Sequence, residues 1–165
     1  MIIRDASRHD LGAILEIYNQ GIEDRIATLE TDLQDMAYME NWYANKNDRY
    51  TVLVAELNNQ VVGWASISPY NLRTAYNGVG EISIYIHRNF RGEGIGKLLL
   101  IELEKRAKQN QFHKLVLFTF SLNLLGQGLY RAMGYREVGI FINQGFLDGE
   151  FVDIMAMEKL LHENL

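Results

Sequence analysis

A strand, a glycine-rich turn and a helix follow one another without a break near the middle of the chain. Within Gly80–His87 (GEISIYIH), isoleucines alternate with other residues, which is typical of a β-strand. The next segment, Arg88–Leu100 (RNFRGEGIGKLLL), sets three glycines within five residues before a leucine-rich run. This order constrains the fold to one in which a strand leads directly, through an almost bare turn, into a helix.

The glycine turn has two interpretations that the residues alone leave open. A helix N-terminus carries unpaired N–H groups and about half a positive charge, so a turn without side chains is suited to a pyrophosphate. Alternatively, the turn only needs positive φ angles. The dinucleotide-binding pattern would require glycine at Lys97, and the P-loop would require a glycine at Arg91 and Ser or Thr at Leu98. The sequence therefore disfavours nicotinamide dinucleotides and ATP.

The composition indicates one domain spanning residues 1–165, since 48% of these 165 residues are hydrophobic. The net charge of -5 and the absence of a basic block disfavour nucleic-acid and membrane partners. The chain has no cysteine, no apolar run near the ~20 residues of a membrane span, and no signal-peptide pattern at MIIRDASRHD. We expect a cytoplasmic protein.

Strands and helices alternate along the rest of the chain, which predicts an α/β fold with helices on both faces of a mixed sheet. Ser7 is expected to cap the first helix, and Asp32 the second. Asn58-Asn59 predicts the turn of a β-hairpin. The expected strands are Ile2–Ile3, Thr51–Leu57, Gln60–Ser68, Gly80–His87, Lys114–Phe120, Tyr135–Ile142 and Phe151–Leu160; beyond the first helix, the expected helices are Leu33–Ala44, Gly92–Lys108 and Leu124–Met133.

Two spaced motifs resemble those of the GNAT N-acetyltransferases. Arg91–Gly96 (RGEGIG) resembles the R/Q-x-x-G-x-G/A motif of that family, and Asn123 followed by Leu129–Gly139 (LYRAMGYREVG) resembles its second conserved segment. The resemblance covers nearly the whole chain. It implies the GNAT fold, a mixed central sheet of about six to seven strands with helices on both faces, in which two splayed strands bind the coenzyme.

The resemblance also implies which residues contact acetyl-CoA. The amides of the turn would hold the pyrophosphate, and the preceding strand would pair its backbone with the pantetheine arm. Gly126 and Gln127 depart from the usual opening of the following helix and would loosen it beside the cofactor. The residues assigned to the coenzyme in this way are Ile84, Tyr85, Ile86, Arg91, Gly92, Glu93, Gly94, Ile95, Gly96 and Asn123.

The N-terminal half resembles one branch of the family. Glu16–Thr31 (EIYNQGIEDRIATLET) is similar to members that acetylate phosphinothricin, arsinothricin and methionine sulfoximine. This resemblance implies acetyl transfer, by direct attack, to the α-amine of a small amino acid or glutamate analogue, in a homodimer. Two alternatives remain: a protein or peptide N-acetyltransferase, and a non-catalytic acyl-CoA-binding module.

Two residues are candidates for proton transfer. Glu81 stands at the position of the branch's catalytic glutamate, and partial burial would raise its pKa enough for a general base near neutral pH. Alternatively, it is a strand-end charge in solvent. Tyr130 is similar to the tyrosine that protonates the departing thiolate in many family members, and its alternative role is that of a core aromatic residue.

Recognition of an amino acid needs a cation for its carboxylate. Arg73 is the best candidate because guanidinium binds carboxylate in a bidentate manner, and its alternative is a surface position in a loop. Tyr76 would close the same pocket. Arg25, with Thr28 nearby, would either bind substrate or pair with Glu23 or Asp24.

Two further expectations concern metals and the terminal hairpin. No metal site is predicted, because His9, His87, His113 and His162 are not spaced as ligands and no H-E-x-x-H is present. Phe146 and Phe151 fall in a segment that resembles the branch's terminal hairpin, where they would pack over a neighbouring subunit's site.

Overall fold

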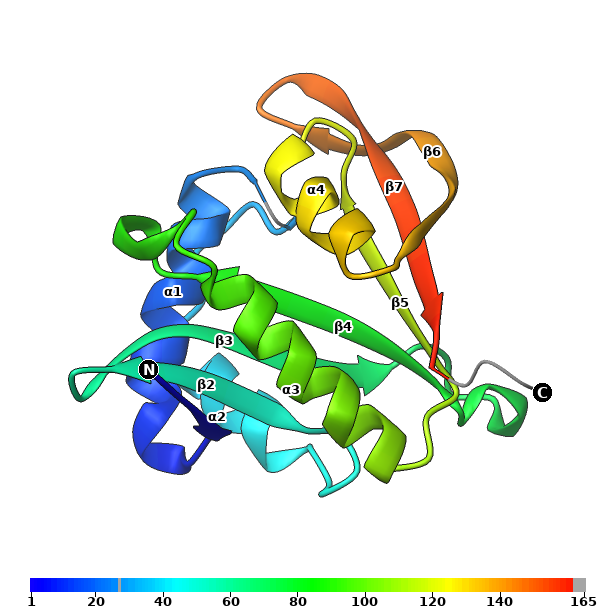
Figure 1. The fold of residues 1–165 in the computed structure, drawn as a ribbon. Helices are drawn as coiled ribbons and strands as arrows, with labels where there is room; N and C mark the ends of the chain where they lie inside the picture. The colour runs from blue at the N-terminus through cyan, green and yellow to red at the C-terminus, as the bar shows by residue number, and fades with distance from the viewer. Residues whose placement is uncertain (27, 162–165) are drawn as a thin grey trace.

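The computed structural model describes residues 1–26 and 28–161. Within these residues, seven strands form one sheet in the order β1-β2-β3-β4-β5-β7-β6, as Figure 1 shows. Only β4 and β5 pair in parallel among the strands described. The strands are β1 Ile2–Asp5, β2 Val52–Leu57, β3 Gln60–Pro69, β4 Val79–Ile86, β5 Lys114–Phe120, β6 Arg136–Leu147 and β7 Glu150–Leu160; the helices are α1 Leu11–Glu23, α2 Met36–Ala44, α3 Ile95–Gln109 and α4 Leu124–Ala132.

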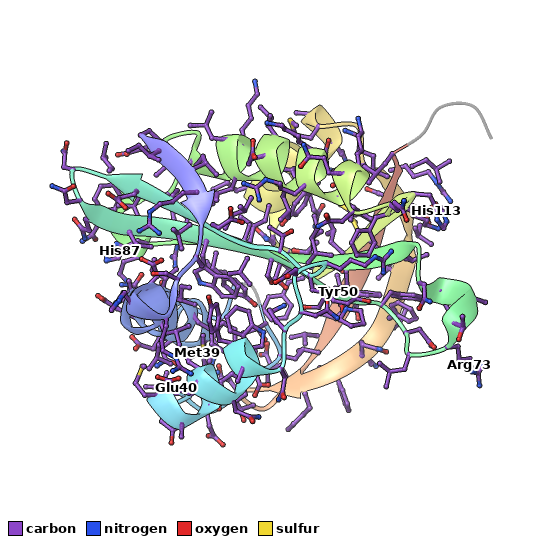
Figure 2. All side chains as sticks on the ribbon, turned by 90° about the horizontal axis from the view of Figure 1, so that it is seen from below. Met39, Glu40, Tyr50, Arg73, His87 and His113 are labelled. Atoms are coloured by element: carbon purple, nitrogen blue, oxygen red, sulfur yellow. The ribbon has the colours of Figure 1, made fainter. Side chains whose placement is uncertain are left out.

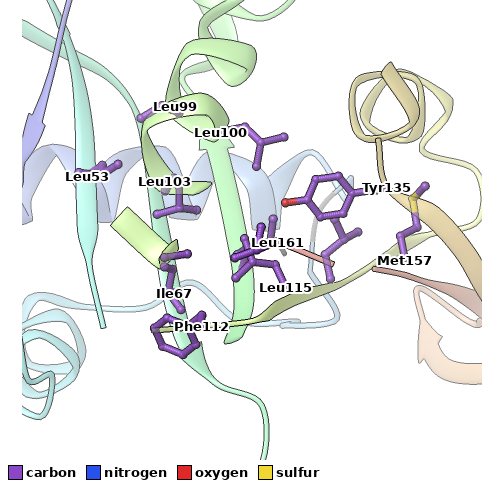
Figure 3. Packing of buried hydrophobic residues seen from close by; sticks show 14 of the residues in the cluster. Leu53, Ile67, Leu99, Leu100, Leu103, Phe112, Leu115, Tyr135, Met157 and Leu161 are labelled. Atoms are coloured by element: carbon purple, nitrogen blue, oxygen red, sulfur yellow. The ribbon is translucent and has the colours of Figure 1, made fainter. Parts of the chain in front are cut away.

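Helices cover both faces of the sheet, which confirms the predicted α/β class (Figure 1). On one face, α3 buries Leu99, Leu100 and Leu103, whose spacing forms a single apolar stripe. This stripe packs on Ile67 and Leu115 of the sheet in the larger core cluster, part of which appears in Figure 3. No described helix has both the length and the hydropathy needed to cross a membrane.

A second cluster lies on the opposite face, under α1 and α2. Ile14 and Ile17 of α1 and Met39 of α2 are buried against Val54 and Trp64 of the hairpin β2–β3. The two isoleucines of α1 are three residues apart, which places them on the same face of the helix. The two clusters therefore hold the hairpin between layers of helix.

The second helix begins later than predicted. Asp35, and not Asp32, is its N-cap, and its carboxylate accepts a hydrogen bond from the Tyr38 amide at 2.9 Å. The reason lies in Asn19 of α1, whose amide group binds both the N–H and the C=O of Gln34 at 2.9 and 3.0 Å. The backbone of Gln34 is thus occupied outside the helix, which excludes the predicted start at Leu33.

The strands β4 and β5 separate soon after they meet. Their pairing is limited to Val79 with Lys114, Gly80 with Leu115 and Glu81 with Val116. Beyond this point β4 remains paired with β3 while β5 follows β7, and Figure 1 shows the two strands diverging. The backbone of β4 after Glu81 therefore has a free edge, which confirms the predicted splay.

Candidate active site

A cavity of about 480 Å³ lies where the free edge of β4 meets the glycine turn and α4. Leu129 and Tyr130 of α4 form one wall, and Phe90 lies beside the turn. Glu93 is the predicted coenzyme residue that does not line this cavity; its side chain is exposed. The predicted residues that do line it are Ile84, Tyr85, Ile86, Arg91, Gly92, Gly94, Ile95, Gly96 and Asn123.

The glycine turn has the positive φ angles that one of its two interpretations requires. Gly92 and Gly94 adopt φ angles of 79° and 83°, a region that residues with a Cβ rarely occupy. Gly94 is the N-cap of α3, so the helix begins at Ile95 and not at the predicted Gly92. A Cβ on either glycine would meet nothing within 4 Å. The turn thus needs glycine for its conformation and also leaves open space before the helix N-terminus.

The third glycine of the motif has a different physical reason. A Cβ on Gly96 would lie 3.0 Å from the Cδ2 atom of Leu129, so glycine lets α3 approach α4 closely. Leu98 donates to the carbonyl of Gly94 at 3.4 Å, and the amides of the three preceding residues lie before the helical ladder. This helix end therefore presents N–H groups beside the cavity.

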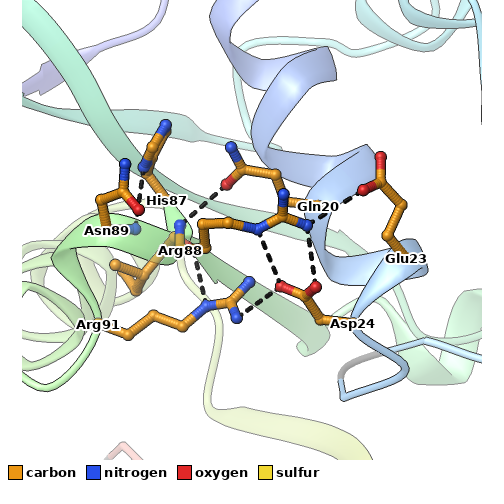
Figure 4. Close-up of polar contacts among 8 residues, drawn as sticks. Gln20, Glu23, Asp24, His87, Arg88, Asn89 and Arg91 are labelled. Carbon is orange, nitrogen blue, oxygen red and sulfur yellow. Dashed lines mark hydrogen bonds and ion pairs between the residues drawn. The ribbon is translucent and has the colours of Figure 1, made fainter.

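A network of charged residues ties the turn to the end of α1, as Figure 4 shows. Arg91 donates to Asp24 at 2.8 Å and to the carbonyl of Ile86 at 3.3 Å. Arg88 also binds Asp24, at 2.9 Å. Although partial burial opposes it, these hydrogen bonds lower the pKa of Asp24. Asp24 therefore fixes the guanidinium of Arg91, and the contacts of Arg91 order the glycine turn.

Asn123 is fixed at the start of α4. Its side chain accepts a hydrogen bond from the Gly126 amide at 3.1 Å and donates one to Thr119 at 3.0 Å. A Cβ on Gly126 would lie 2.5 Å from the side-chain nitrogen of Asn123, so this glycine is required for the cap. Gln127 is buried and donates to the carbonyl of Ser121 at 2.9 Å. The prediction that these two residues loosen the helix is wrong, because both belong to its capping structure.

A second cavity, of about 410 Å³, lies on the other side of Tyr85. Glu81 and Ser83 line it from β4, and Thr28 lines it from the segment after α1. Glu81 is half-buried, and this burial raises the pKa of its carboxyl. Because Tyr85 lines both cavities, they meet at the middle of the free strand.

Tyr130 faces the first cavity and also packs against the larger core cluster. Its ring lies 5.7 Å from that of Tyr135. Burial raises the pKa of Tyr130 to about 12, so its hydroxyl carries a proton at neutral pH. The residue therefore occupies both of its predicted environments, the core and the cavity wall.

Arg73 and Tyr76 lie outside both cavities. Figure 2 shows Arg73 at the outer end of the loop between β3 and β4, pointing away from the sheet. Its guanidinium has no hydrogen bond or ion pair with residues 1–26 and 28–161. Tyr76 stacks edge-on against Tyr70, with ring centroids 5.5 Å apart. The structure thus does not bring Arg73 beside Glu81.

Arg25 pairs with a residue distant in the chain and not with its predicted partners. It binds Asp148, in the turn between β6 and β7, with Nε at 3.1 Å from the carboxylate. It also donates to the carbonyl of Thr31 at 3.3 Å. Pairing with Glu23 or Asp24, which the sequence suggested, does not occur because these carboxylates bind Arg88 instead.

Some residues of the second cavity were missed from the sequence. Ser83 was detectable, because it lies between Glu81 and Tyr85 on the same face of a strand with period two. Phe118 and Gln144 come from β5 and β6, and no local pattern connects them with Glu81. In the described residues, no group of three His, Asp or Glu side chains is placed to hold a metal. His162 lies outside the described residues.

Comparisons with known proteins agree with this geometry. The family model described as "Acetyltransferase (GNAT) family" matches residues 14–135. The L-methionine sulfoximine/L-methionine sulfone acetyltransferase of Pseudomonas paraeruginosa is 32% identical over 94% of this chain and 92% of its own.

Two solved structures extend the comparison. A phosphinothricin acetyltransferase from Sinorhizobium meliloti in complex with AcCoA is 32% identical, with a TM-score of 0.93, over 98% of this chain and 89% of its own. The ribosomal-protein-alanine N-acetyltransferase from Brucella melitensis is 35% identical, with a TM-score of 0.94, over 97% of this chain and 99% of its own.

Proposed function

The chain belongs to the GNAT acetyltransferase family, and from this premise we propose that it transfers the acetyl group of acetyl-CoA to the α-amine of a small amino acid or glutamate analogue. One observation carries the proposal. Two cavities meet at Tyr85, one beside the glycine turn and the other beside the half-buried Glu81. The relatives named for phosphinothricin and methionine sulfoximine support this acceptor class. We include arsinothricin because it is another analogue of glutamate.

The residues around the larger cavity fit the chemistry of acetyl-CoA. The amides at the N-terminus of α3 are suited to its pyrophosphate, and Gly94 places no side chain in front of them. The free edge of β4 at Ile84–Ile86 offers backbone groups to the amides of the pantetheine arm. The coenzyme supplies the activated acetyl thioester, and the protein supplies its orientation.

We assign the proton transfers to Glu81 and Tyr130. Glu81 takes the proton from the acceptor ammonium, directly or through a water, and the free amine then attacks the thioester carbonyl. An amide of β4 near Tyr85 donates to the developing oxyanion. As the carbon–sulfur bond breaks, Tyr130 gives its proton to the departing thiolate, and the attacking nitrogen releases its second proton to water. Alignment of the two substrates across Tyr85 contributes more than either proton transfer, because it replaces a bimolecular encounter.

We expect Tyr130→Phe to lower the turnover number roughly tenfold or more while acetyl-CoA affinity is retained. The substitution removes only the hydroxyl and keeps the ring that packs against Tyr135. The measurement is steady-state thiol release together with calorimetric titration of acetyl-CoA. Tyr135→Phe is the matched control, since Tyr135 is buried and does not line the cavity. Equal turnover in both variants would exclude Tyr130 as the general acid.

Arg73 remains our candidate for the α-carboxylate of the acceptor. It lies on the loop that leads into β4, and its exposed guanidinium has no ion-pair partner in the described part of the chain. This role requires the loop to turn toward Glu81 when the acceptor binds. Under this proposal, Arg73→Ala raises the KM of every amino-acid acceptor.

A second candidate function is acetylation of a peptide or ribosomal-protein amine. It is favoured by the 35% identity to the ribosomal-protein-alanine N-acetyltransferase from Brucella melitensis. A panel of acceptors separates the candidates: phosphinothricin, arsinothricin, methionine sulfoximine and glutamate beside a peptide and a polyamine. We expect thiol release with the amino-acid analogues. Release with the peptide alone would establish the second function, and binding of acetyl-CoA with no release would indicate a non-catalytic module.

We further propose that two copies associate through the outer hairpin β6–β7. Phe146 and Phe151 form a cross-strand pair with ring centroids 5.2 Å apart, and their side chains are 61% and 64% exposed. Val138, Ile140 and Ile142 of β6 are exposed as well. Apolar groups gathered on one surface commonly mark a contact between proteins. The ion pair of Arg25 with Asp148 fastens this hairpin beside Thr28 of the second cavity.

Replacement of Phe146 and Phe151 by serine is expected to convert a dimer into a monomer at micromolar concentration. The measurement is sedimentation velocity, which reports the mass directly. Ile101→Ser is the control, because Ile101 is also exposed, at 48%, and lies on α3 and not on the hairpin. Wild-type protein that sediments as a monomer would refute the proposed association.

A further inference from the structure

A row of paired residues leads away from Glu81 along the sheet, on the face covered by α1 and α2. Opposite residues of an antiparallel pair project their side chains from the same face and touch one another. The row therefore runs from Glu81, across a polar floor, to a pair of stacked aromatic rings. The pairs, in order, are Ser68 with Glu81, Ser66 with Ser83, and Trp64 with Tyr85.

All residues of this row except Glu81 line a third cavity, of about 160 Å³. Tyr38 and Trp42 of α2 form its opposite wall, and Trp42 meets Trp64 edge-on with ring centroids 5.5 Å apart. Ser83 and Tyr85 also line the cavity that holds Glu81, so the two cavities adjoin. We call this third cavity the serine–tryptophan pocket; it is lined by Tyr18, Tyr38, Met39, Trp42, Trp64, Ser66, Ser68, Ser83 and Tyr85.

Trp64, which lines the serine–tryptophan pocket, carries an unpaired hydrogen-bond donor. The side chain is buried, with 4% exposure, and its Nε1 has no hydrogen-bond partner in residues 1–26 and 28–161. Leaving such a group unpaired costs about 1–3 kcal/mol, and buried polar groups are seldom left so in native proteins. Because the nitrogen itself is buried, an acceptor group of a ligand pairs with it only when the indole shifts toward the pocket.

Lys46 lines a neighbouring cavity, beside Tyr50 and Pro69, and reaches the serine–tryptophan pocket through its contact with Ser68. Its ammonium lies 3.4 Å from the Ser68 hydroxyl, 3.1 Å from the carbonyl of Ile67 and 4.8 Å from the centroid of the Trp42 ring. It forms no ion pair within the described residues. Burial lowers the pKa of Lys46 to about 8, which leaves most of it charged at neutral pH. A partly buried cation without a carboxylate attracts an anionic or oxygen-rich group.

We propose, on the basis of the function proposed above, that the serine–tryptophan pocket receives the oxygen-bearing end of the acceptor's side chain. The donors around it are the Trp64 indole, the serine hydroxyls and the Lys46 ammonium, and no residue that lines it is acidic. Phosphinate, arsinate, sulfone, sulfoximine and carboxylate groups accept such hydrogen bonds. The aromatic walls pack against the methylene groups that join this end to the α-carbon. A basic side chain is disfavoured by Lys46.

The chain carries two tryptophans, and both line the serine–tryptophan pocket. Intrinsic fluorescence therefore reports on it without any need for turnover. We expect phosphinothricin to produce a saturable change, and norleucine, which lacks the terminal oxygens, to produce none at equal concentration. In Trp64→Phe, Trp42 still reports, and the apparent dissociation constant for phosphinothricin should rise about tenfold, the loss of one good hydrogen bond.

Kinetics of acetyl transfer give the second readout. Lys46→Met keeps the aliphatic stem and removes the charge, so we expect it to raise the KM of phosphinothricin at least tenfold more than that of norleucine. An unaltered melting temperature and acetyl-CoA affinity would show that the variant is folded. Equal losses for both acceptors would overturn the proposal, because they would place Lys46 at the α-carboxylate. Unchanged values for both would overturn it as well.

The same experiments separate this proposal from the general function. Wild-type protein that acetylates none of the amino acids would refute the proposed function. A fluorescence change confined to the oxygen-bearing compound would still support the serine–tryptophan pocket in that case. Turnover of both phosphinothricin and norleucine with equal efficiency would uphold the function and reject the pocket.

Discussion

Glu81→Gln is expected to lower the turnover of acetyl transfer about 100-fold or more, with the affinity for acetyl-CoA unchanged. The substitution keeps the shape of a half-buried side chain in the second cavity and removes its capacity to accept a proton. Stopped-flow or steady-state assays of thiol release measure the turnover, and calorimetric titration measures the affinity for acetyl-CoA. Undiminished turnover would contradict the assignment of Glu81 as the base.

The pH dependence gives an independent test of the same residue. Burial raises the pKa of Glu81, so the base becomes protonated, and the rate falls, at a pH above the ordinary range of glutamate. A profile of kcat/KM should show this acidic limb in the wild-type protein. In Glu81→Gln the residual activity should lack it. A limb that persists in the variant would belong to another group.

At neutral pH, Glu81→Gln should stabilise the protein although it lowers the activity. A raised pKa means that the folded protein binds this proton more tightly than the unfolded chain does. The contribution to stability is therefore fully present below the unfolded pKa and is lost as pH rises through the folded pKa. Glu81→Gln should melt at a higher temperature than the wild-type protein at neutral pH, and the difference should vanish in acid. A lower melting temperature at neutral pH would indicate a structural role.

Gly94→Ala is expected to weaken acetyl-CoA binding about tenfold or more. Gly94 has a φ angle of 83° at the start of α3, and for a residue with a Cβ that conformation costs about 1–2 kcal/mol. Relief of this strain would turn the amides of the helix N-terminus away from the pyrophosphate. Isothermal titration measures the affinity, and chemical unfolding measures the stability.

Gly12→Ala is the matched control for this substitution. Gly12 lies in α1 with ordinary helical geometry, and a Cβ there would also meet nothing within 4 Å. Alanine is the better helix former, so the control should be stabilised by up to about 1 kcal/mol and bind acetyl-CoA normally. If Gly94→Ala is destabilised yet binds acetyl-CoA as tightly as the wild-type protein, the turn serves conformation alone.

Local patterns predicted the elements that their own residues stabilise. The hairpin around Asn58-Asn59 and the alternating strand before the glycine turn form as the sequence indicated. The start of α2 was missed because Asn19, a residue of α1, binds the backbone of Gln34. A helix boundary that depends on a side chain from another helix has no signature in the helix itself.

In the candidate site, too, the sequence predicted the features that nearby residues set and missed those that depend on distant residues. The motif Arg91–Gly96 predicted the turn that borders the larger cavity, because the three glycines that shape it lie within five residues of the chain. The suggested pairing of Arg25 with Glu23 or Asp24 was wrong because its partner, Asp148, is 123 residues away in the chain. The direction of the loop that carries Arg73, which points away from the sheet, could not be predicted either, because no residue of the loop itself sets that direction (Figure 2).

The sequence by itself determined the order of strands and helices, the glycine turn with its left-handed residues, and Glu81 on a strand beside that turn. Those features arise from backbone preferences and from periodicity over a few residues. Only the tertiary structure decided that β4 leaves β5 after Glu81, that Thr28 and Phe118 join Glu81 in one cavity, and that Lys46 reaches Ser68. These are contacts between segments distant in the chain, and packing of the whole sheet against its helices fixes them.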